Sequence, residues 1–500
     1  MCFTSTSSRP SNFSFLLLAI LQLGISHLSV GQMQQAGRLE IPVPNNENAN
    51  FSVVAAGQEG LMLYRRLYAS PQDKLEITRV DTLFKQVWRG TIEIAKGLQA
   101  VKALVHQGYL FVLFKANNIR YADFLIAAVD IADGAYTVYR VNNLIPFGPT
   151  EFVVTNEAAF IGGYFNYRPL IVYFNFASQK SKILPGFFNE VGELAQVKPY
   201  SDGSVEVIVS SDNYEKKRCL WIRSYDAKGD LSKTIILEPG DKKNLIFGRS
   251  INMGNDEQAV VGVYGRFKEY SRGIFIARIG PEGGYRIRYY DYGDLHHFFN
   301  YMKAARQERI KQRIERKKIK GKKAKFNYRF IVHEVIKAQD NFIMLGEAFY
   351  PKYAYVNGMS QTRILIGYQY THAVIIGFDD KGNLLWDNSF EIKDVQTPTL
   401  GQHVKIQAAD DNIYMQYAYA NEVRGKIIKG PEIVEGKSSN DLMLKYDDDV
   451  IKGSEYENSK LDYWYGKKLF IYGVQQIRNN SLSRANGTRK VFFINKILYK

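Results

Sequence analysis

The chain contains almost no cysteine. Its only two cysteines are Cys2, in a segment that resembles a leader peptide, and Cys219. No intramolecular disulfide is therefore expected after removal of the leader, and a chain of this length can bury a large apolar core without one. Cys219 stands in the strand-like run CLWIRSYD, which favours a small core residue over a nucleophile.

Other common signals are also missing. Proline is scarce, with 14 residues, and no low-complexity tract occurs, which argues against a disordered chain. Beyond the N-terminus no apolar run reaches the length of about 18 residues that a membrane-spanning helix needs. The sequence has no paired-histidine zinc motif, phosphate-binding glycine loop or nucleophile elbow, and the cluster Asp291, Asp294, His296 and His297 matches no standard metal site. We therefore predict neither a metal nor a cofactor.

Residues 1–31 have the pattern of a secretory signal. Arg9 is their only charged residue, residues 13–25 are an apolar stretch, and Ser29-Val30-Gly31 places small residues where cleavage requires them. We therefore expect an exported protein, periplasmic or extracellular, with no transmembrane span after the signal is removed. An N-terminal anchor that is not cleaved is the alternative.

One supersecondary unit recurs along the rest of the chain. The segments VDTLFKQVWRGTIEI (80–94) and FDDKGNLLWDNSFEI (378–392) both place an aspartate seven residues before a tryptophan. Both also end with an apolar residue that is followed by Glu and Ile. Each unit opens with two β-runs across a tight turn, and two more runs follow. The second runs begin near Leu61, Tyr109, Ala159, Val205, Gln258, Phe342, Asn412 and Leu469.

Four antiparallel strands at this period are typical of a β-propeller blade. The sequence predicts an all-β fold, a closed propeller of about eight four-stranded blades that forms a single domain over residues 38–500. Seven blades is the alternative, because the first unit has the weakest first strand. The last unit has no fourth strand, and RLEIPV (38–43) is a spare strand, so we expect it to complete the last blade and close the ring.

The turn before the fourth run is also repeated. It begins with Asp and has Gly at the fourth position, as in Asp226 to Gly229 and Asp379 to Gly382. Together with the tryptophan that follows, this turn resembles the blades of quinoprotein-like propellers of the pyrroloquinoline-quinone type. Their usual turn carries a Thr-Gly pair and is one residue longer. The resemblance therefore implies a secreted propeller repeat and no cofactor.

Strand order sorts the loops onto two faces. The turns from first to second and from third to fourth strands share one face, which we call the short-turn face. The longer loops share the other, the long-loop face, where binding residues usually lie. Tyr and Arg recur together in these longer loops, for example at Arg65 with Tyr68 and at Tyr353 with Arg363.

Tyrosine and arginine are frequent side chains of recognition surfaces. We therefore predict that the long-loop face binds a partner. The alternative is that a chain rich in both residue types scatters such pairs in its loops. The candidate residues are Arg120, Tyr121, Tyr167, Arg168, Tyr270 and Arg272.

Residues 294–325 form a basic insertion between the fifth and sixth units. From residue 303 to residue 325 there are twelve Lys or Arg and two Glu, a net charge of +10 out of +16 for the whole chain. Good helix formers run from Asp294, a plausible N-cap, to Lys320, and we expect this helix to bury little apolar surface. The candidate binding residues are Arg306, Arg309, Arg313, Arg316, Lys317, Lys318, Lys320, Lys322, Lys323 and Lys325.

These features predict an exported, non-catalytic binding or scaffold protein. Its partner would be an anionic surface, an anionic polymer or an acidic protein, and nucleic acid is not expected for an exported chain. A basic helix that merely projects into water is the alternative for the insertion. A second hypothesis is a propeller hydrolase that acts on glycans or peptides with carboxylates near the axis. Three or more Asp, Glu or His side chains within hydrogen-bond reach at the long-loop mouth of the channel would favour it.

Overall fold

The computed structural model describes residues 33–44, 51–117, 123–143, 145–187, 191–240, 242–338, 341–355, 363–409, 411–454, 459–479, 481 and 487–499. The signal predicted over residues 1–31 lies outside these ranges, and so do two candidate binding residues, Arg120 and Tyr121. In the described ranges, no helix is both long and apolar enough to cross a membrane.

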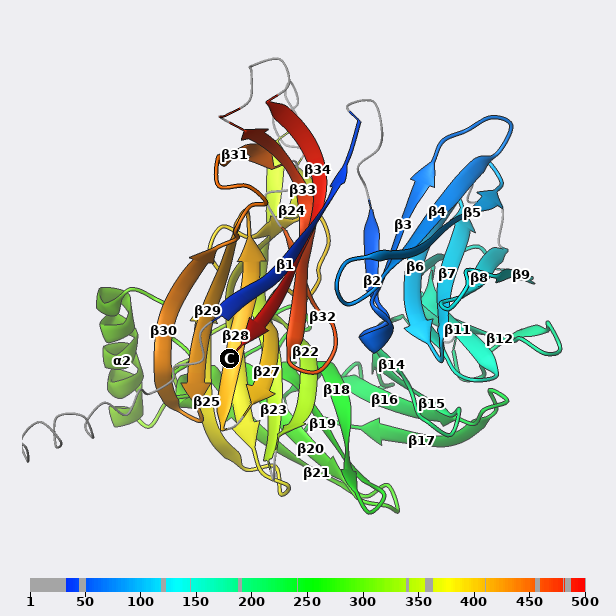
Figure 1. Cartoon of the computed structure of the whole chain (residues 1–500). Coiled ribbons are helices and arrows are strands. Elements are labelled where there is room, and N and C mark those ends of the chain that lie inside the picture. The colour runs from blue at the N-terminus through cyan, green and yellow to red at the C-terminus, as the bar shows by residue number, and fades with distance from the viewer. Residues whose placement is uncertain are drawn as a thin grey trace, which may run out of the picture.

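Eight antiparallel sheets follow one another around a ring (Figure 1). The first two blades are β2 (Ser52–Ala55), β3 (Leu61–Leu67), β4 (Asp73–Val80) and β5 (Gln86–Ile94), then β6 (Leu98–His106), β7 (Tyr109–Ala116), β8 (Phe124–Asp130) and β9 (Tyr136–Val141). The short helix η1 (Gly57–Glu59) joins β2 to β3. The third and fourth are β10 (Gly148–Val154), β11 (Ala158–Phe165), β12 (Arg168–Asn175) and β13 (Ser181–Ile183), then β14 (Gly192–Pro199), β15 (Val205–Asp212), β16 (Arg218–Tyr225) and β17 (Leu231–Leu237).

The second half of the chain repeats this plan. The fifth blade is β18 (Asn244–Gly254), β19 (Glu257–Gly265), β20 (Gly273–Ile279) and β21 (Tyr285–Asp291). The sixth is β22 (Arg329–Ala338), β23 (Asn341–Tyr355), β24 (Arg363–Phe378) and β25 (Leu384–Glu391), with β26 (Gln396–Thr397) added to β24. The seventh is β27 (Lys405–Ala409), β28 (Asn412–Tyr419), β29 (Glu422–Lys429) and β30 (Glu432–Asp441). The eighth contains β31 (Asp449–Ser454), β32 (Lys460–Tyr463), β33 (Lys468–Asn479) and β34 (Thr488–Tyr499).

Eight blades of four main strands confirm the predicted architecture, and the seven-blade alternative is wrong. First strands of successive blades contact one another, for example β2 with β6, β6 with β10 and β14 with β18, so these strands surround the centre of the ring. The apolar core lies between blades, since each hydrophobic cluster takes residues from adjacent blades. The middle strands are therefore covered on both faces, which explains why their sequences are apolar without alternation.

The ring closes through its N-terminal strand, as RLEIPV predicted. Strand β1 (Met33–Pro42) pairs antiparallel with β34, with Arg38 opposite Asn495 and Ile41 opposite Phe492. The eighth blade then packs on the first in one apolar cluster. In addition, the Trp464 indole N–H donates to the Gly60 carbonyl at 3.0 Å. The first and last parts of the chain thus hold each other in place.

The predicted Asp-Gly turns are confirmed by their hydrogen bonds. Asp226 accepts from the backbone N–H groups of Lys228 and Asp230, both at 2.9 Å, and Gly229 has a φ of +73°. Gly382 has the same φ in the sixth blade, where Asp379 caps the turn in the same way. Glycine is favoured there because an L side chain rarely adopts this conformation.

The basic insertion differs from its prediction. After η2 (Tyr292–Asp294), the helix α2 (Ala304–Ile319) begins nine residues later than expected, with Lys303 at its N-cap. An N-cap at Asp294 is wrong. The reason is tertiary: the Asp387 carboxylate accepts the backbone N–H groups of His296 and His297 at 2.8 and 2.7 Å, which ties the chain to the sixth blade.

Burial also divides the insertion into two parts. No residue of α2 is buried, and only Ile310 and Ile314 make partly buried apolar contacts. By contrast, Leu295, Phe298 and Phe299 are buried in the core between the fifth and sixth blades. The expectation of little apolar burial therefore holds for α2 and is wrong for the segment that precedes it.

Candidate functional site

The candidate site is the long-loop face with α2 beside it. On this face Tyr167 is 82% exposed in the tight turn between β11 and β12, and Arg168 follows it, also exposed. Tyr270 is exposed as well, but the guanidinium above its ring, at 5.1 Å, belongs to Arg329. Arg272 is half-buried, and its backbone N–H pairs with the Tyr264 carbonyl at 2.7 Å.

Tyr and Arg side chains do pair on this face, but often with other partners than the sequence suggested. Arg66 lies 5.0 Å from the Tyr68 ring, while Arg65 lies 4.6 Å from the ring of Phe51. Consecutive residues of a strand point to opposite faces of the sheet, so only one of two adjacent arginines reaches a given ring. The pairing of Arg65 with Tyr68 suggested by sequence proximity is therefore replaced by a pairing of Arg66 with Tyr68.

A cleft of about 410 Å³ opens between the first and second blades. Its wall includes Tyr64, Arg65, Arg66 and Tyr68. Both arginines are already neutralised: Arg65 lies 3.1 Å from the Glu76 carboxylate, and Arg66 pairs with the Asp73 carboxylate. This cleft is therefore a weak site for an anion, because carboxylates of the same blade already neutralise its two arginines.

The insertion carries positive charge that is not neutralised. Lys323 pairs with Asp294 at 2.7 Å and with Asp291 at 3.2 Å. None of the other nine candidate residues of the insertion has a carboxylate within ion-pairing distance in the described part of the chain. Figure 1 shows α2 at the margin of the ring, beside the blades and not between them. The helix thus presents most of its cations to solvent.

These cations are arranged along one line of the helix. With about 3.6 residues per turn, six of them project within a sector of about 100°, and the line is about 21 Å long. Ile310 and Ile314 lie at the edge of this sector toward the ring, and Glu308 and Glu315 lie on the far side. We call the six residues the basic stripe. They are Arg306, Arg309, Arg313, Arg316, Lys317 and Lys320.

Sequence reasoning missed a buried acidic group between the sixth and seventh blades. The carboxylate of Glu347 is fully buried, lies 2.9 Å from His333 Nε2, and accepts the backbone N–H groups of His403 and Val404 at 3.1 and 2.6 Å. Burial opposes its charged form, but the attraction of His333 and these donated bonds outweigh burial and hold the pKa of Glu347 below its usual value. No local motif links these residues in sequence, so no signal could have found them.

This group fixes loops near the centre of the ring. Both oxygens of Glu347 hold the chain that enters β27. Next to His333, the Glu334 carboxylate accepts the Tyr463 hydroxyl at 3.0 Å, and that hydroxyl also accepts the Ile406 backbone N–H at 2.9 Å. The first strands of three blades are thereby joined.

The same residues bear on the hydrolase hypothesis. Near the long-loop mouth of the channel, Glu347 contacts His333, and the His403 imidazole interacts electrostatically with both groups. Among all described residues, no group of three His, Cys, Asp or Glu is placed to hold a metal ion. A second buried imidazole, His372, is stacked 3.6 Å from the Tyr301 ring, and burial lowers its pKa to about 3.

No protein-family model and no curated protein matches the chain. Among solved structures it is similar to polysaccharide lyase Uly1, with 12% identity, a TM-score of 0.43, and coverage of 93% of this chain and 99% of that one. It is also similar to the β-propeller domain of the Trilobed protease from Pyrococcus furiosus, with 10% identity, a TM-score of 0.36, and coverage of 80% and 95%. The chain is a β-propeller protein, and no specific family is assigned to it. The substrates of these proteins carry no weight for this chain at such identities.

Proposed function

We propose that this chain is an exported binding protein that docks an extended anionic polymer along the basic stripe of α2, next to the long-loop face. The observation that carries the proposal is the stripe itself: six cations on one side of a solvent-exposed helix, with no carboxylate partner among the described residues. The location outside the cytoplasm comes from the signal pattern of residues 1–31.

One stripe residue, Arg313, also contacts the protein itself, since its guanidinium lies 5.2 Å from the Phe326 ring. Like charges three or four residues apart destabilise a helix by a few tenths of a kcal/mol per pair. No residue of α2 is buried, so packing compensates for little of this repulsion. A polyanion would neutralise the cations and release its own counterions, which makes binding favourable and strongly dependent on salt.

An extended polymer fits the stripe better than the other predicted partners. Apart from the adjacent pair Arg316 and Lys317, successive stripe residues are separated by about 4.5–6 Å along the helix axis, which suits a chain with repeated carboxylates or sulfates. A flat anionic membrane would also engage Lys311 and Lys318 on the other flank of α2. Furthermore, an interfacial helix usually exposes a large apolar face, and α2 offers only Ile319 as a strongly exposed apolar side chain.

The stripe can be tested with two charge-matched double variants. Arg309→Gln with Arg316→Gln removes two stripe cations, and Lys311→Gln with Lys318→Gln removes two cations at the same spacing on the other flank. With polygalacturonate as the probe, we expect the stripe variant to lose at least tenfold in affinity at 0.15 M NaCl and its log–log salt slope to fall by about two. The flank variant should lose less than threefold.

Titration calorimetry over a range of NaCl concentrations measures both quantities. Equal losses in the two variants would show that only net charge matters, and the stripe would then have no special role. If polygalacturonate does not bind but vesicles with phosphatidylglycerol do, the partner is a membrane surface and the polymer proposal is wrong.

A further inference from the structure

A second cleft lies on the short-turn face, opposite the long-loop face. It has a volume of about 380 Å³ and opens between the second and third blades. Turns from both blades form its rim: His106 and Gln107 at the end of β6, Asp130 and Ala135 at the turn that ends β8, and Thr155 and Asn156 after β10. Its size is within the usual range for small-molecule sites.

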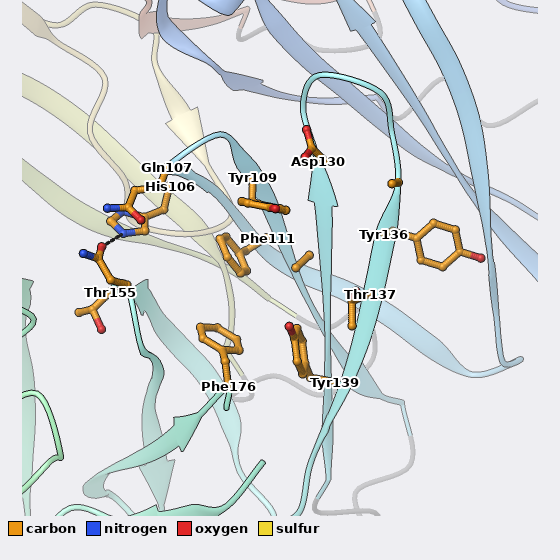
Figure 2. A pocket seen from close by; sticks show the side chains of 13 residues that line it. His106, Gln107, Tyr109, Phe111, Asp130, Tyr136, Thr137, Tyr139, Thr155 and Phe176 are labelled. Atoms are coloured by element: carbon orange, nitrogen blue, oxygen red, sulfur yellow. Dashed lines mark hydrogen bonds between the residues drawn. The ribbon is translucent and has the colours of Figure 1, made fainter. Parts of the chain in front are cut away.

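Aromatic rings form much of the wall. Figure 2 shows Tyr109, Phe111, Phe176 and Tyr139 gathered together, with Asp130 at the turn beyond them. The ring of Phe176 lies 5.5 Å from that of Phe111 and 5.1 Å from that of Tyr139. Tyr109 is 42% exposed, so one large ring remains open to a ligand. The wall therefore offers both a packed aromatic floor and an accessible ring.

Two of these aromatic residues are departures from the repeat. Tyr109 lies opposite Asp130, the residue that caps the turn after the third strand. In other blades with the same Asp or Asn cap, the corresponding residue on the second strand is Gly60, Ala158, Ser204 or Asn341. The tyrosine is thus specific to this blade.

Phe176 is the second departure. It follows the turn cap Asn175, and the residues in its place after the other caps are Thr82, Ile131, Ala227 and Asp380. Its aromatic ring meets the blade that carries Tyr109, so both departures converge in the same cleft. In a repeat protein, packing explains what the units share, and two neighbouring exceptions at one cleft point to a ligand.

The polar groups of the cleft suit hydroxyl groups better than a charged ligand. Asp130 uses Oδ1 to accept the Ala132 N–H at 2.7 Å, and His106 Nε2 lies 3.0 Å from Asn156 Oδ1. The hydroxyls of Tyr109 and Tyr139 have no hydrogen-bond partner among the described residues. No Lys or Arg lines the cleft, so nothing there attracts an anion. The wall offers mixed donors and acceptors beside flat rings.

We infer that this cleft binds a neutral sugar, whose ring packs on Tyr109 and whose hydroxyls bond to Asp130 and to the His106–Asn156 pair. The C–H face of a sugar ring is weakly positive and complements the negative face of an aromatic ring. The hydroxyls both donate and accept, as the groups around the rings do. This site is on the opposite face from the long loops and does not depend on the basic stripe.

The test uses the full chain and a panel of neutral oligosaccharides: cellohexaose, mannohexaose, maltohexaose and chitohexaose. We expect at least one of them to bind in titration calorimetry. Tyr109→Ala should then weaken binding at least tenfold, whereas Tyr109→Phe, which keeps the ring, should weaken it less than threefold. Asp130→Asn should weaken it several-fold without disturbing the turn, because Asn175 already caps the equivalent turn in the third blade.

Two controls separate binding from folding. Tyr214, 90% exposed on the long-loop face, gives the matched variant Tyr214→Ala, which should bind as the unaltered chain does. The melting temperature of Tyr109→Ala should stay within a few degrees, since its ring is partly exposed. The proposal is overturned if none of the four sugars binds, or if Tyr109→Ala binds the sugar as tightly as the unaltered chain.

Discussion

A chain that lacks residues 1–44 is expected not to fold, whereas a chain that lacks residues 1–32 is expected to fold normally. The two truncated chains differ only in residues 33–44, which are β1 and the two residues that follow it. This strand supplies the fourth strand of the eighth blade and pairs along nearly its whole length with β34. Its loss would expose the edge of β34 and open the ring between the last and first blades.

The size of the effect follows from what β1 buries. Val43 is 4% exposed, and Leu39 and Ile41 pack against the same cluster between the eighth and first blades. At about 1.5–3 kcal/mol for each buried side chain, their removal takes away most of the stability of a typical domain. Arg489 also loses its ion pair with Glu40, which spans 3.0 Å in the intact chain.

Thermal unfolding followed by circular dichroism compares the two truncations. We expect the longer truncation to be insoluble or to show no cooperative transition. A cooperative transition within a few degrees of that of the shorter truncation would contradict closure of the ring by β1.

The second large effect on stability is expected when Phe298 is replaced. The sequence predicts this residue within a solvent-exposed helix, but it lies before α2. Its ring is fully buried and lies 4.4 Å from the Tyr292 ring and 5.2 Å from the His372 ring. Phe298→Ala should lower the free energy of unfolding by about 3–5 kcal/mol, because it leaves a cavity between the fifth and sixth blades. Urea denaturation measures this change.

The matched control is removal of α2 itself. Replacing residues 304–319 by a short Gly/Ser linker should change the free energy of unfolding by about 1 kcal/mol or less, since only Ile310 and Ile314 make partly buried contacts. A loss as large as that of Phe298→Ala would show that α2 is part of the core. If Phe298→Ala lowers the free energy of unfolding by less than about 1 kcal/mol, the segment that precedes α2 is not part of the core.

Local patterns in the sequence were enough to predict the blades. The second strands begin within one residue of the predicted positions, for example at Leu61, Tyr109 and Val205. Apolar runs and Asp-Gly turns act over a few residues, and their repetition at a steady period leaves little choice of fold. The closing strand was also predictable, because an incomplete last unit and a spare first strand are complementary.

The site residues depended on contacts that a single sequence does not reveal. Glu347, His333 and His403 come from three separate segments, and the bulge in β22 between Val332 and Glu334 determines where His333 points. The start of α2 was misplaced for the same reason, since Asp387 lies about ninety residues from the chain that it holds. The aromatic cleft was missed because exceptions to a repeat are visible only after the blades are aligned.

Hydrogen exchange of the backbone amides, with and without polygalacturonate, tests the proposed docking most directly. Because α2 buries no residue, its amides should exchange quickly in the free protein. If the polymer lies along the basic stripe, exchange in residues 304–319 should slow at least tenfold on binding, and this protection should disappear at high salt. Protection confined to the blades, with α2 exchanging as it does in the free protein, would contradict the account.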